Sequence, residues 1–154
     1  MKDEKKIKKV VITSGFFNPV HIGHINLIKE SKKLGDYLIV IVNNDKQVKI
    51  KGSVEFMPEQ ERMAIIEAME FVDEVFLSID DDGFVAKSLE EIGKRHSGKK
   101  LIFAKGGDRN IDNIPSSERD ICVEFGIEVV SGVGGDKVQS SSWLLSKLRI
   151  NDTF

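Results

Sequence analysis

The residues Val-Val-Ile-Thr-Ser-Gly at 10–15 and Phe-Phe-Asn-Pro-Val-His-Ile-Gly-His at 16–24 decide the fold of this chain. The first part is a β-branched run that ends at a glycine, which is typical of a buried parallel strand. Apolar residues at helical spacing follow from His24 to Leu34, and Gly35 is the expected C-terminal cap. A strand, a glycine-bearing turn and a helix in this order predict the first unit of an alternating α/β fold.

The same alternation continues along the rest of the chain. Further short apolar runs bounded by turn residues predict strands, at 37–42, 75–78, 101–104 and 127–130. Helical stretches are expected between and after them, at 58–70, at 85–94, at 117–125 with Gly126 as cap, and from a cap at Ser141 or Ser142 onward. This order predicts an α/β fold: a doubly wound, five-stranded parallel sheet with helices on both faces.

The composition is that of an ordinary globular protein. The 154 residues fit one domain, 1–154, in which residues 1–8 form a charged lead-in. A formal net charge of −2 argues against a general nucleic-acid partner. The one cysteine, Cys122, cannot form an internal disulfide and is expected as a buried apolar residue of a helix. The longest apolar run is too short to span a membrane, so we expect a cytoplasmic protein.

Unusual residues gather in the segments that follow the predicted strands. These segments are 14–23, 43–57, 105–115 and 131–142. In open parallel sheets the ligand binds beyond the carboxyl ends of the strands, near the point where strand order reverses. We therefore expect one site that is built from these four loops.

His21 and His24 are the most informative residues of the first loop. Their spacing of three places both imidazoles on one side of a helix start, where free N–H groups and a partial positive charge favour phosphate. Gly15 and Gly23 remove side chains where a ligand or neighbouring chain must come close. The plain alternative is one packed and one solvated histidine. Zinc is less favoured, because no third ligand lies nearby in the sequence.

The run 15–24 resembles the signature of the cytidylyltransferase-like nucleotidyltransferases, with its His-x-Gly-His motif. Other stretches resemble glycerol-3-phosphate cytidylyltransferases in the same order, namely 34–40, 51–52, 61–62 and 72–75. Residues 105–108, Lys-Gly-Gly-Asp, are closer to the nucleotidyltransferase domain of ADP-heptose synthases, and 140–142 resemble the family's C-terminal serine and threonine run. The resemblance implies the Rossmann-like nucleotidyltransferase fold.

The family likeness implies a reaction class. A nucleoside monophosphate would pass from CTP or ATP to a small phosphorylated acceptor, a sugar phosphate or polyol phosphate, with release of pyrophosphate. Mg²⁺ would be held mainly by the triphosphate, without a metal site of the protein, and the enzyme would be a homodimer. Two alternatives stay open: a non-catalytic nucleotide sensor, since fold does not determine function, and an FMN adenylyltransferase.

The resemblance also implies residue roles. The expected catalytic residues are His21, His24 and Lys51. The expected nucleotide-binding residues are Gly15, Phe16, Phe17, Gly23, Gly106, Gly107, Asp108, Ser140, Ser141 and Ser142. The expected acceptor-binding residues are Asn18, Arg62 and Arg109.

Several of these residues have a structural alternative. Lys51 is a solvated loop charge in that alternative, and Arg62 forms a surface ion pair with Glu59 or Glu61. Residues 106–109 would be a tight turn, and the serines at 140–142 would only cap a helix. Family members carry an arginine before these serines, a role that only Lys137 could fill here.

Overall fold

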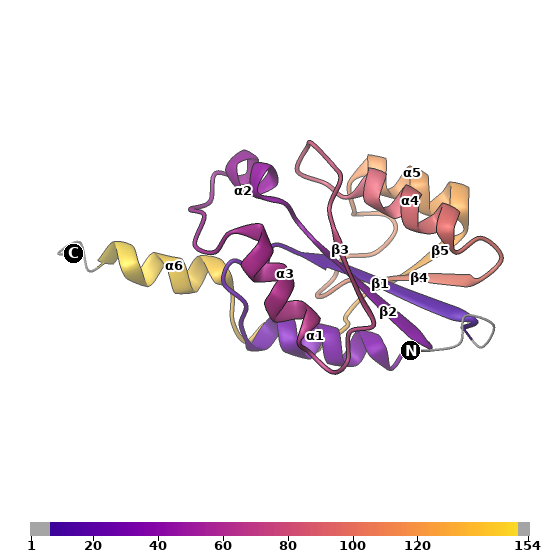
Figure 1. The fold of residues 1–154 in the computed structure, drawn as a ribbon, viewed down its shortest axis with the longest axis horizontal. Coiled ribbons are helices and arrows are strands. Elements are labelled where there is room, and N and C mark those ends of the chain that lie inside the picture. Colours follow the sequence, from indigo (N-terminus) through magenta and orange to yellow (C-terminus); the bar gives the residue numbers. More distant parts are fainter. Residues whose placement is uncertain (1–6, 151–154) are drawn as a thin grey trace.

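The computed structural model describes residues 7–150 and contains one parallel sheet. Its strand order is β3-β2-β1-β4-β5 (Figure 1). The strands are β1 (Lys9–Gly15), β2 (Tyr37–Val42), β3 (Glu74–Leu77), β4 (Lys100–Ala104) and β5 (Ile127–Val130). In the centre of the sheet, Ile12 of β1 pairs with Ile39 on one side and Phe103 on the other. The predicted five-stranded parallel sheet is therefore confirmed.

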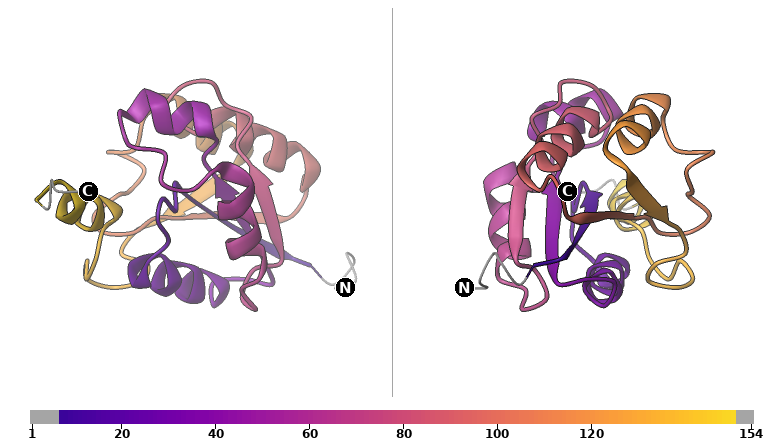
Figure 2. Two further views of the ribbon diagram at one scale, coloured as in Figure 1. Left: turned by 60° about the vertical axis from the view of Figure 1, so that its left-hand side comes forward. Right: turned by 90° about the vertical axis from the view of Figure 1, so that its right-hand side faces the viewer.

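Helices cover both faces of this sheet (Figures 1 and 2). One face carries α1 (Ile22–Lys32) and α3 (Glu59–Glu67), and the other carries α4 (Ala86–Arg95) and α5 (Ser116–Phe125). Helix α2 (Asp45–Lys51) follows β2 at the carboxyl edge of the sheet. Helix α6 (Ser141–Ile150) projects from the body, as Figure 1 shows.

Two hydrophobic cores lie against the two faces of the sheet. Val10 and Ile12 of β1 point into the core that also contains Cys122 of α5. Val11, between them, points into the core that contains Ile28 of α1. Successive strand residues face opposite sides, so a strand buried on both faces shows no polar alternation. This explains why the runs looked continuously apolar, and it confirms the buried position of Cys122.

Several local predictions need correction. Helix α1 ends at Lys32, with Lys33 as its cap, so Gly35 is not the cap. A Cβ at Gly35 would lie 2.8 Å from Val11 Cγ2, which shows that close packing on β1 requires this glycine. The cap of α6 is Ser140, whose Oγ accepts from the Trp143 N–H, not Ser141 or Ser142.

One helix was missed, and the lead-in is shorter than expected. Helix α2 lies within 43–57, which was expected to be a loop. Asn44 caps it with a reciprocal pair of hydrogen bonds to Gln47. The sequence Asn-x-x-Gln is a capping-box pattern, so this motif could have predicted the start of the helix. Of the predicted lead-in 1–8, residues 1–6 lie outside the described part, and Ile7 is buried in the core.

The strand order defines where a ligand site is expected. The chain moves from β1 outward through β2 and β3, and then returns to place β4 on the other side of β1. The order therefore reverses between β1 and β4, and the loops that leave these two strands open a crevice there. Helix α1 begins at this crevice.

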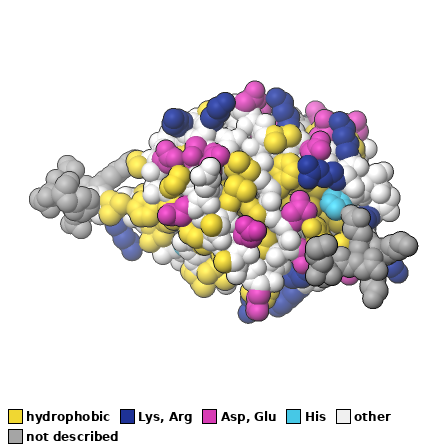
Figure 3. Space-filling view, viewed as in Figure 1, with side chains coloured by type: hydrophobic (Ala, Val, Ile, Leu, Met, Phe, Trp, Pro, Cys, Tyr) yellow, Lys and Arg dark blue, Asp and Glu magenta, His cyan; other side chains and the backbone are white. Residues whose placement is uncertain are grey.

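The molecular surface carries mixed charge. On the face seen in Figure 3, acidic and basic side chains are interspersed, and hydrophobic side chains run along the projecting α6. Trp143 and Leu148 of that helix are exposed. Across residues 7–150, none of the helices combines the length and the apolar character that crossing a bilayer would need.

Candidate functional site

The two histidines of the first loop form a reciprocal cap at the start of α1. His21 is the cap residue, and its Nδ1 accepts from the Gly23 N–H at 3.0 Å. His24 Nδ1 in turn accepts from the His21 N–H at 3.2 Å. A ring nitrogen that accepts a hydrogen bond carries no proton, so each neutral imidazole has its proton on Nε2. Each ring therefore has one N–H donor that the helix cap does not use.

The imidazoles also lie side by side and stay neutral. Their centroids are 3.8 Å apart with an interplanar angle of 28°, as the spacing of three predicted. Burial, then His21 and Lys51, lower the pKa of His24 to about 3. Burial, then Lys137, lower the pKa of His21 below its usual value. A Cβ at Gly23 would lie 2.9 Å from His21 Cε1, so the motif's glycine makes room for its own histidine.

Phe17 packs against His24 of this pair. It is fully buried, and its ring meets His24 edge-on with centroids 4.8 Å apart. Its backbone has φ 54°, a left-handed conformation that is uncommon for a bulky residue and marks a constrained loop. A Cβ at Gly15 would lie 2.8 Å from Phe17 Cζ, so Gly15 accommodates this ring.

Asn18 does not face the crevice. Its side chain is buried, donates to the Val54 carbonyl at 2.7 Å, and accepts from the N–H groups of Phe56 and Met57, each at 2.9 Å. These bonds use both ends of the amide to hold the 54–57 loop. The amide of Asn18 is thus engaged with the protein at both ends, and its expected acceptor contact stays a prediction.

Arg62 is likewise turned inward. Its exposed fraction is 0%, and Nη1 donates to the carbonyls of Phe16 at 2.7 Å and Asn43 at 2.6 Å. Nε donates to the Met57 carbonyl at 3.0 Å, and Nη2 pairs with Asp45 Oδ1 at 2.8 Å. The guanidinium thus ties together the first loop, the end of β2, the start of α2 and the start of α3.

This geometry overturns the expected surface ion pair of Arg62 with Glu59 or Glu61, because the buried guanidinium pairs with Asp45. The expected acceptor role of Arg62 stays a prediction. Glu59 instead accepts from the Asp45 N–H at 2.8 Å, which adds a second tie between α2 and α3. Sequence alone could not show this, because a buried arginine and an exposed one look identical in a helical pattern.

Two cavities open at the crevice. The histidine cavity has a volume of about 450 Å³ and is lined by His21, Gly23, His24, Leu27, Gly106–Arg109 and residues 133–139. The Glu118 cavity has a volume of about 350 Å³ and is lined by Ser14, Gly15, Phe16, Asn43, Gly83, Phe84, Val85, Lys105, Arg109, Pro115 and Glu118. Arg109 lines both, so the two cavities adjoin at this residue.

Residues 12–140 match the cytidylyltransferase-like family. The chain belongs to this family of nucleotidyltransferases. It is 42% identical over 106 residues to an FAD synthase of Ferroglobus placidus, across 69% of this chain and 63% of that protein. It is 31% identical over 134 residues to an FAD synthase of Thermoplasma volcanium, across 86% of this chain and 89% of that protein.

Other relatives are larger proteins. The chain is 36% identical over 130 residues to the bifunctional protein HldE of Desulfatibacillum aliphaticivorans, across 83% of this chain but 23% of HldE.

Among solved structures, a lipopolysaccharide core biosynthesis protein from Thermoplasma volcanium GSS1 superimposes with a TM-score of 0.66 at 28% identity, over 84% of this chain and 99% of that one. The chain thus spans less than two thirds of some relatives it matches.

Backbone of two glycine-rich loops forms part of the far wall of the histidine cavity in this nucleotidyltransferase. The Gly132 N–H donates to the Gly107 carbonyl at 2.8 Å, and the Val133 N–H donates to the Lys105 carbonyl at 3.1 Å. These bonds join the loops that follow β4 and β5. Gly134 has φ 91°, and a Cβ there would lie 3.0 Å from Leu27 N of α1. Gly106 and Gly107 lie in a turn that lines this cavity, and their expected contact with the nucleotide stays a prediction.

Lys51 lies near enough to His24 to affect its pKa, and its expected catalytic role stays a prediction. It is in the last turn of α2, with Nζ 4.4 Å from the Phe16 ring centroid, and it contributes to the lowered pKa of His24. Lys137, which sequence reasoning named only as a substitute for an arginine, lines the histidine cavity and lowers the pKa of His21. Two cations therefore flank the imidazole pair.

The serine run lies at the entrance of α6. Ser140 Oγ caps the helix, and Ser141 Oγ donates to the Pro19 carbonyl at 2.8 Å, which joins α6 to the first loop. Ser142 is exposed. The hydroxyls of Ser140 and Ser141 thus have structural partners, and the serines follow Gln139, which lines the histidine cavity.

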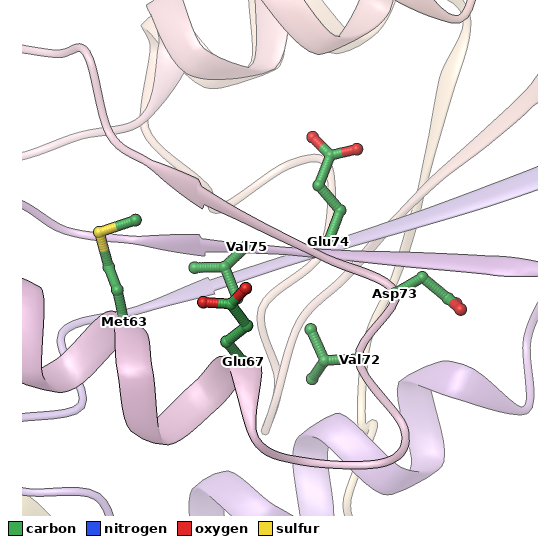
Figure 4. A pocket seen from close by; sticks show the side chains of 6 residues that line it. All are labelled: Met63, Glu67, Val72, Asp73, Glu74 and Val75. Carbon is green, nitrogen blue, oxygen red and sulfur yellow. The ribbon is translucent and has the colours of Figure 1, made fainter. Parts of the chain in front are cut away.

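A third hollow lies at the opposite edge of the sheet, at the start of β3 (Figure 4). It is lined by Met63, Glu67, Val72, Asp73, Glu74 and Val75. Asp73 accepts from the Leu38 N–H at 2.8 Å, and Glu74 accepts from the Tyr37 hydroxyl at 2.9 Å. Figure 4 shows Glu74 directed away from Glu67. The carboxylates of Asp73 and Glu74 in this hollow are thus engaged in holding β3 to β2.

Proposed function

We propose that this protein transfers the adenylyl group of ATP to FMN, which yields FAD and pyrophosphate. The relatives named FAD synthase support this choice, because one of them is matched over 89% of its own length. The relatives named HldE are matched over only 23% to 28% of theirs. The flavin alternative is therefore favoured over a sugar phosphate or polyol phosphate acceptor, and ATP over CTP.

The observation that carries the proposal is the pair of Nε2–H donors on the neutral imidazoles of His21 and His24. In the reaction a phosphate oxygen of FMN attacks the α-phosphorus of ATP, the bond to the β-phosphate oxygen breaks, and pyrophosphate leaves. The attacking oxygen is already an anion, so no general base is needed. Donors that are positioned before the reaction stabilise charge on the phosphate oxygens without further reorganisation.

Charge neutralisation would come from lysines on both sides of the imidazoles. Lys51 on α2 and Lys137 on the loop before α6 lie close enough to affect the two histidine pKa values. In this proposal His21 and His24 donate to oxygens of the triphosphate, and the two ammonium groups balance its charge. Backbone N–H groups at 15–17 and at the start of α6 would add neutral donors.

The two cavities suggest how the substrates divide. The base and ribose of ATP would occupy the histidine cavity, between Gly106, Gly107 and Asp108 on one wall and residues 133–139 on the other. FMN would occupy the Glu118 cavity. Arg109 lines both cavities, so its guanidinium is placed to bind the phosphate that passes between them.

Mg²⁺ would be carried by the triphosphate. Within residues 7–150, no three His, Cys, Asp or Glu side chains are grouped as metal ligands. Magnesium usually keeps several water molecules and binds substrate phosphates, so the proposal assigns most of its ligands to ATP. The homodimer implied by the family stays a prediction.

Pyrophosphate release tests the proposed function. ATP and CTP are each offered with FMN, with a panel of sugar phosphates and with a panel of polyol phosphates. We expect turnover with ATP and FMN, with one FAD formed for each pyrophosphate released. Turnover with sugar phosphates alone would move the protein to the other acceptor class. Nucleotide binding without turnover for any acceptor would identify the protein as a sensor.

A further inference from the structure

Glu118 carries a buried oxygen that the fold leaves without a partner. It lies in the first turn of α5 with an exposed fraction of 4%. Its Oε2 accepts from the Val85 N–H at 3.1 Å. Within the described part of the chain, Oε1 has no hydrogen-bond partner. A buried carboxylate oxygen without a partner costs stability, so such an atom is a candidate for a ligand contact.

The Glu118 cavity provides the space for that ligand. Glu118 lines it together with Lys105, which follows β4 and is partly buried. Lys105 Nζ lies 4.7 Å from the Phe103 ring centroid. None of the ion pairs among residues 7–150 joins Lys105 to Glu118. An acceptor and a donor therefore face one cavity without closing on each other.

The electrostatics agree with this arrangement. Burial is the main cause of the raised pKa of Glu118, and Lys105 opposes that shift. Burial is also the main cause of the lowered pKa of Lys105, and Glu118 opposes that shift in turn. The two charged groups thus sense each other across the cavity while both are poorly hydrated.

The remaining wall of the cavity is largely apolar. Phe16 and Phe84 contribute aromatic rings, and Val85 and Pro115 add apolar surface. The side-chain amide of Asn43, which also lines the cavity, donates to Gln47 Oε1 at 3.1 Å and is thereby engaged. A polyol has many hydroxyls to satisfy, whereas these walls suit a flat ring with a few polar atoms at one edge.

Resting on the proposed function, we propose that Glu118 and Lys105 determine acceptor specificity by reading the imide edge of a planar heteroaromatic ring. Glu118 Oε1 accepts the hydrogen bond of the ring N–H. Lys105 Nζ donates to a ring carbonyl beside it, and Phe16 and Phe84 contact the ring itself. The isoalloxazine of FMN carries such an edge, with one N–H between two carbonyl groups. Both residues bind the acceptor at a distance from its phosphate.

Glu118→Gln tests this assignment with the smallest change. The amide oxygen still accepts from the Val85 N–H, while the partnerless oxygen becomes an NH₂ group that cannot accept. We expect the Kd for FMN to rise on the order of tenfold or more, because the ring N–H then has no acceptor. Quenching of flavin fluorescence measures this Kd. The KM for ATP should not change. Glu124→Gln is the matched control, since Glu124 lies exposed on the same helix.

A modified ligand makes the test specific to one hydrogen bond. FMN methylated at the imide nitrogen lacks the N–H, so the wild-type protein should bind it on the order of tenfold less tightly than FMN. Glu118→Gln should bind the two flavins equally. Equal discrimination by both proteins, or FMN binding by Glu118→Gln at wild-type strength, would overturn the assignment. If thermal unfolding shows that Glu118→Gln does not fold, Lys105→Met is measured against both flavins instead, with weaker binding of both expected.

The outcomes separate this inference from the proposed function. FMN turnover that does not depend on Glu118 removes only the inference. FMN binding that depends on Glu118 but yields no pyrophosphate removes only the proposed reaction. The absence of both binding and turnover of FMN in the wild-type protein removes both.

Discussion

The two sides of the crevice are built in opposite ways. On the side of β1, the loop 15–24 is held by buried side chains, among them Phe17, Asn18 and Arg62. On the side of β5, the loop 131–140 has exposed and half-buried residues, is rich in glycine, and is held by backbone hydrogen bonds. The first side presents two imidazoles in one fixed geometry, and the second presents glycine-rich backbone together with Lys137.

This difference matches what each side is proposed to do. Transfer of a phosphoryl group needs donors held within a fraction of an ångström, and buried side chains provide that rigidity. Contact with a base or ribose needs close approach of the main chain, which glycine permits. The comparison predicts that substitutions on the first side affect stability and rate most, and that those on the second side affect nucleotide binding.

The largest effect is expected for Arg62→Met. Removal of the guanidinium leaves the carboxylate of Asp45 and three carbonyls without their donor, which costs about 3–5 kcal/mol in the free energy of unfolding. Denaturant titration measures this loss. The control is Arg95→Met, at an exposed pair with Glu91, which should cost at most about 1 kcal/mol. Equal losses in the two variants would contradict the inner role of Arg62.

His24→Ala should be next in size and should affect rate. Loss of one oriented donor to a transferring phosphate lowers kcat on the order of a hundredfold or more. The helix start keeps His21 as its cap, so the cooperative thermal transition should remain. Steady-state kinetics with ATP and FMN provides the measurement. Activity at the wild-type level would show that the imidazole pair does not serve the reaction.

A pair of glycines tests the second side. Gly134 and Gly135 both have positive φ, but only at Gly134 would a Cβ meet backbone, 3.0 Å from Leu27 N. Gly134→Ala should therefore cost about 1–3 kcal/mol more than Gly135→Ala, because overpacking is added to the same backbone strain. The unfolding free energies and the KM for ATP are compared. Indistinguishable variants would mean that the loop does not rest on α1.

Lys51→Met should raise the KM for ATP about tenfold. This factor corresponds to the free energy that one hydrogen bond to a charged group usually contributes to binding. Lys49→Met is the matched control, because Lys49 is exposed in the same last turn of α2. Steady-state kinetics at several ATP concentrations separates KM from kcat. An equal response to both substitutions would assign the effect to net charge and not to the position of Lys51.

The smallest effect is expected for the dependence of kcat and of stability on pH through His24. With a pKa of about 3, His24 stays neutral between pH 5 and 8, so kcat should not fall near pH 6.5 through this residue. Between pH 6.5 and pH 3 the unfolded chain binds a proton at His24 and the folded chain does not. The neutral His24 therefore lowers the free energy of unfolding progressively as the pH falls through this range. His24→Ala should therefore lose less stability than the wild type between pH 7.5 and pH 5.

Nitrogen NMR of the histidine rings checks the same point directly. We expect His24 to show the proton on Nε2 across this pH range, because its Nδ1 accepts from the His21 backbone N–H. A titration of His24 near pH 6.5 would contradict the buried, neutral state.

The order of the strands and the shared side of the two imidazoles were predicted from the sequence alone, whereas helix α2 was not. Apolar runs of strand length that alternate with helical spacing leave few topologies, and a spacing of three on a helix has only one geometric meaning. Gly107 also follows from a local rule, since it has a positive φ where the chain turns after β4.

Only the tertiary structure decided which polar side chains face the crevice and which face the interior. Asn18 and Arg62 lie in the motif region but bond inward, and Glu118, which no motif marks, lines a cavity. Whether a charged side chain is buried depends on chain segments far apart in the sequence that meet around it. A pattern of local spacing contains no information about such meetings, because burial and hydrogen-bond satisfaction are properties of the packed whole.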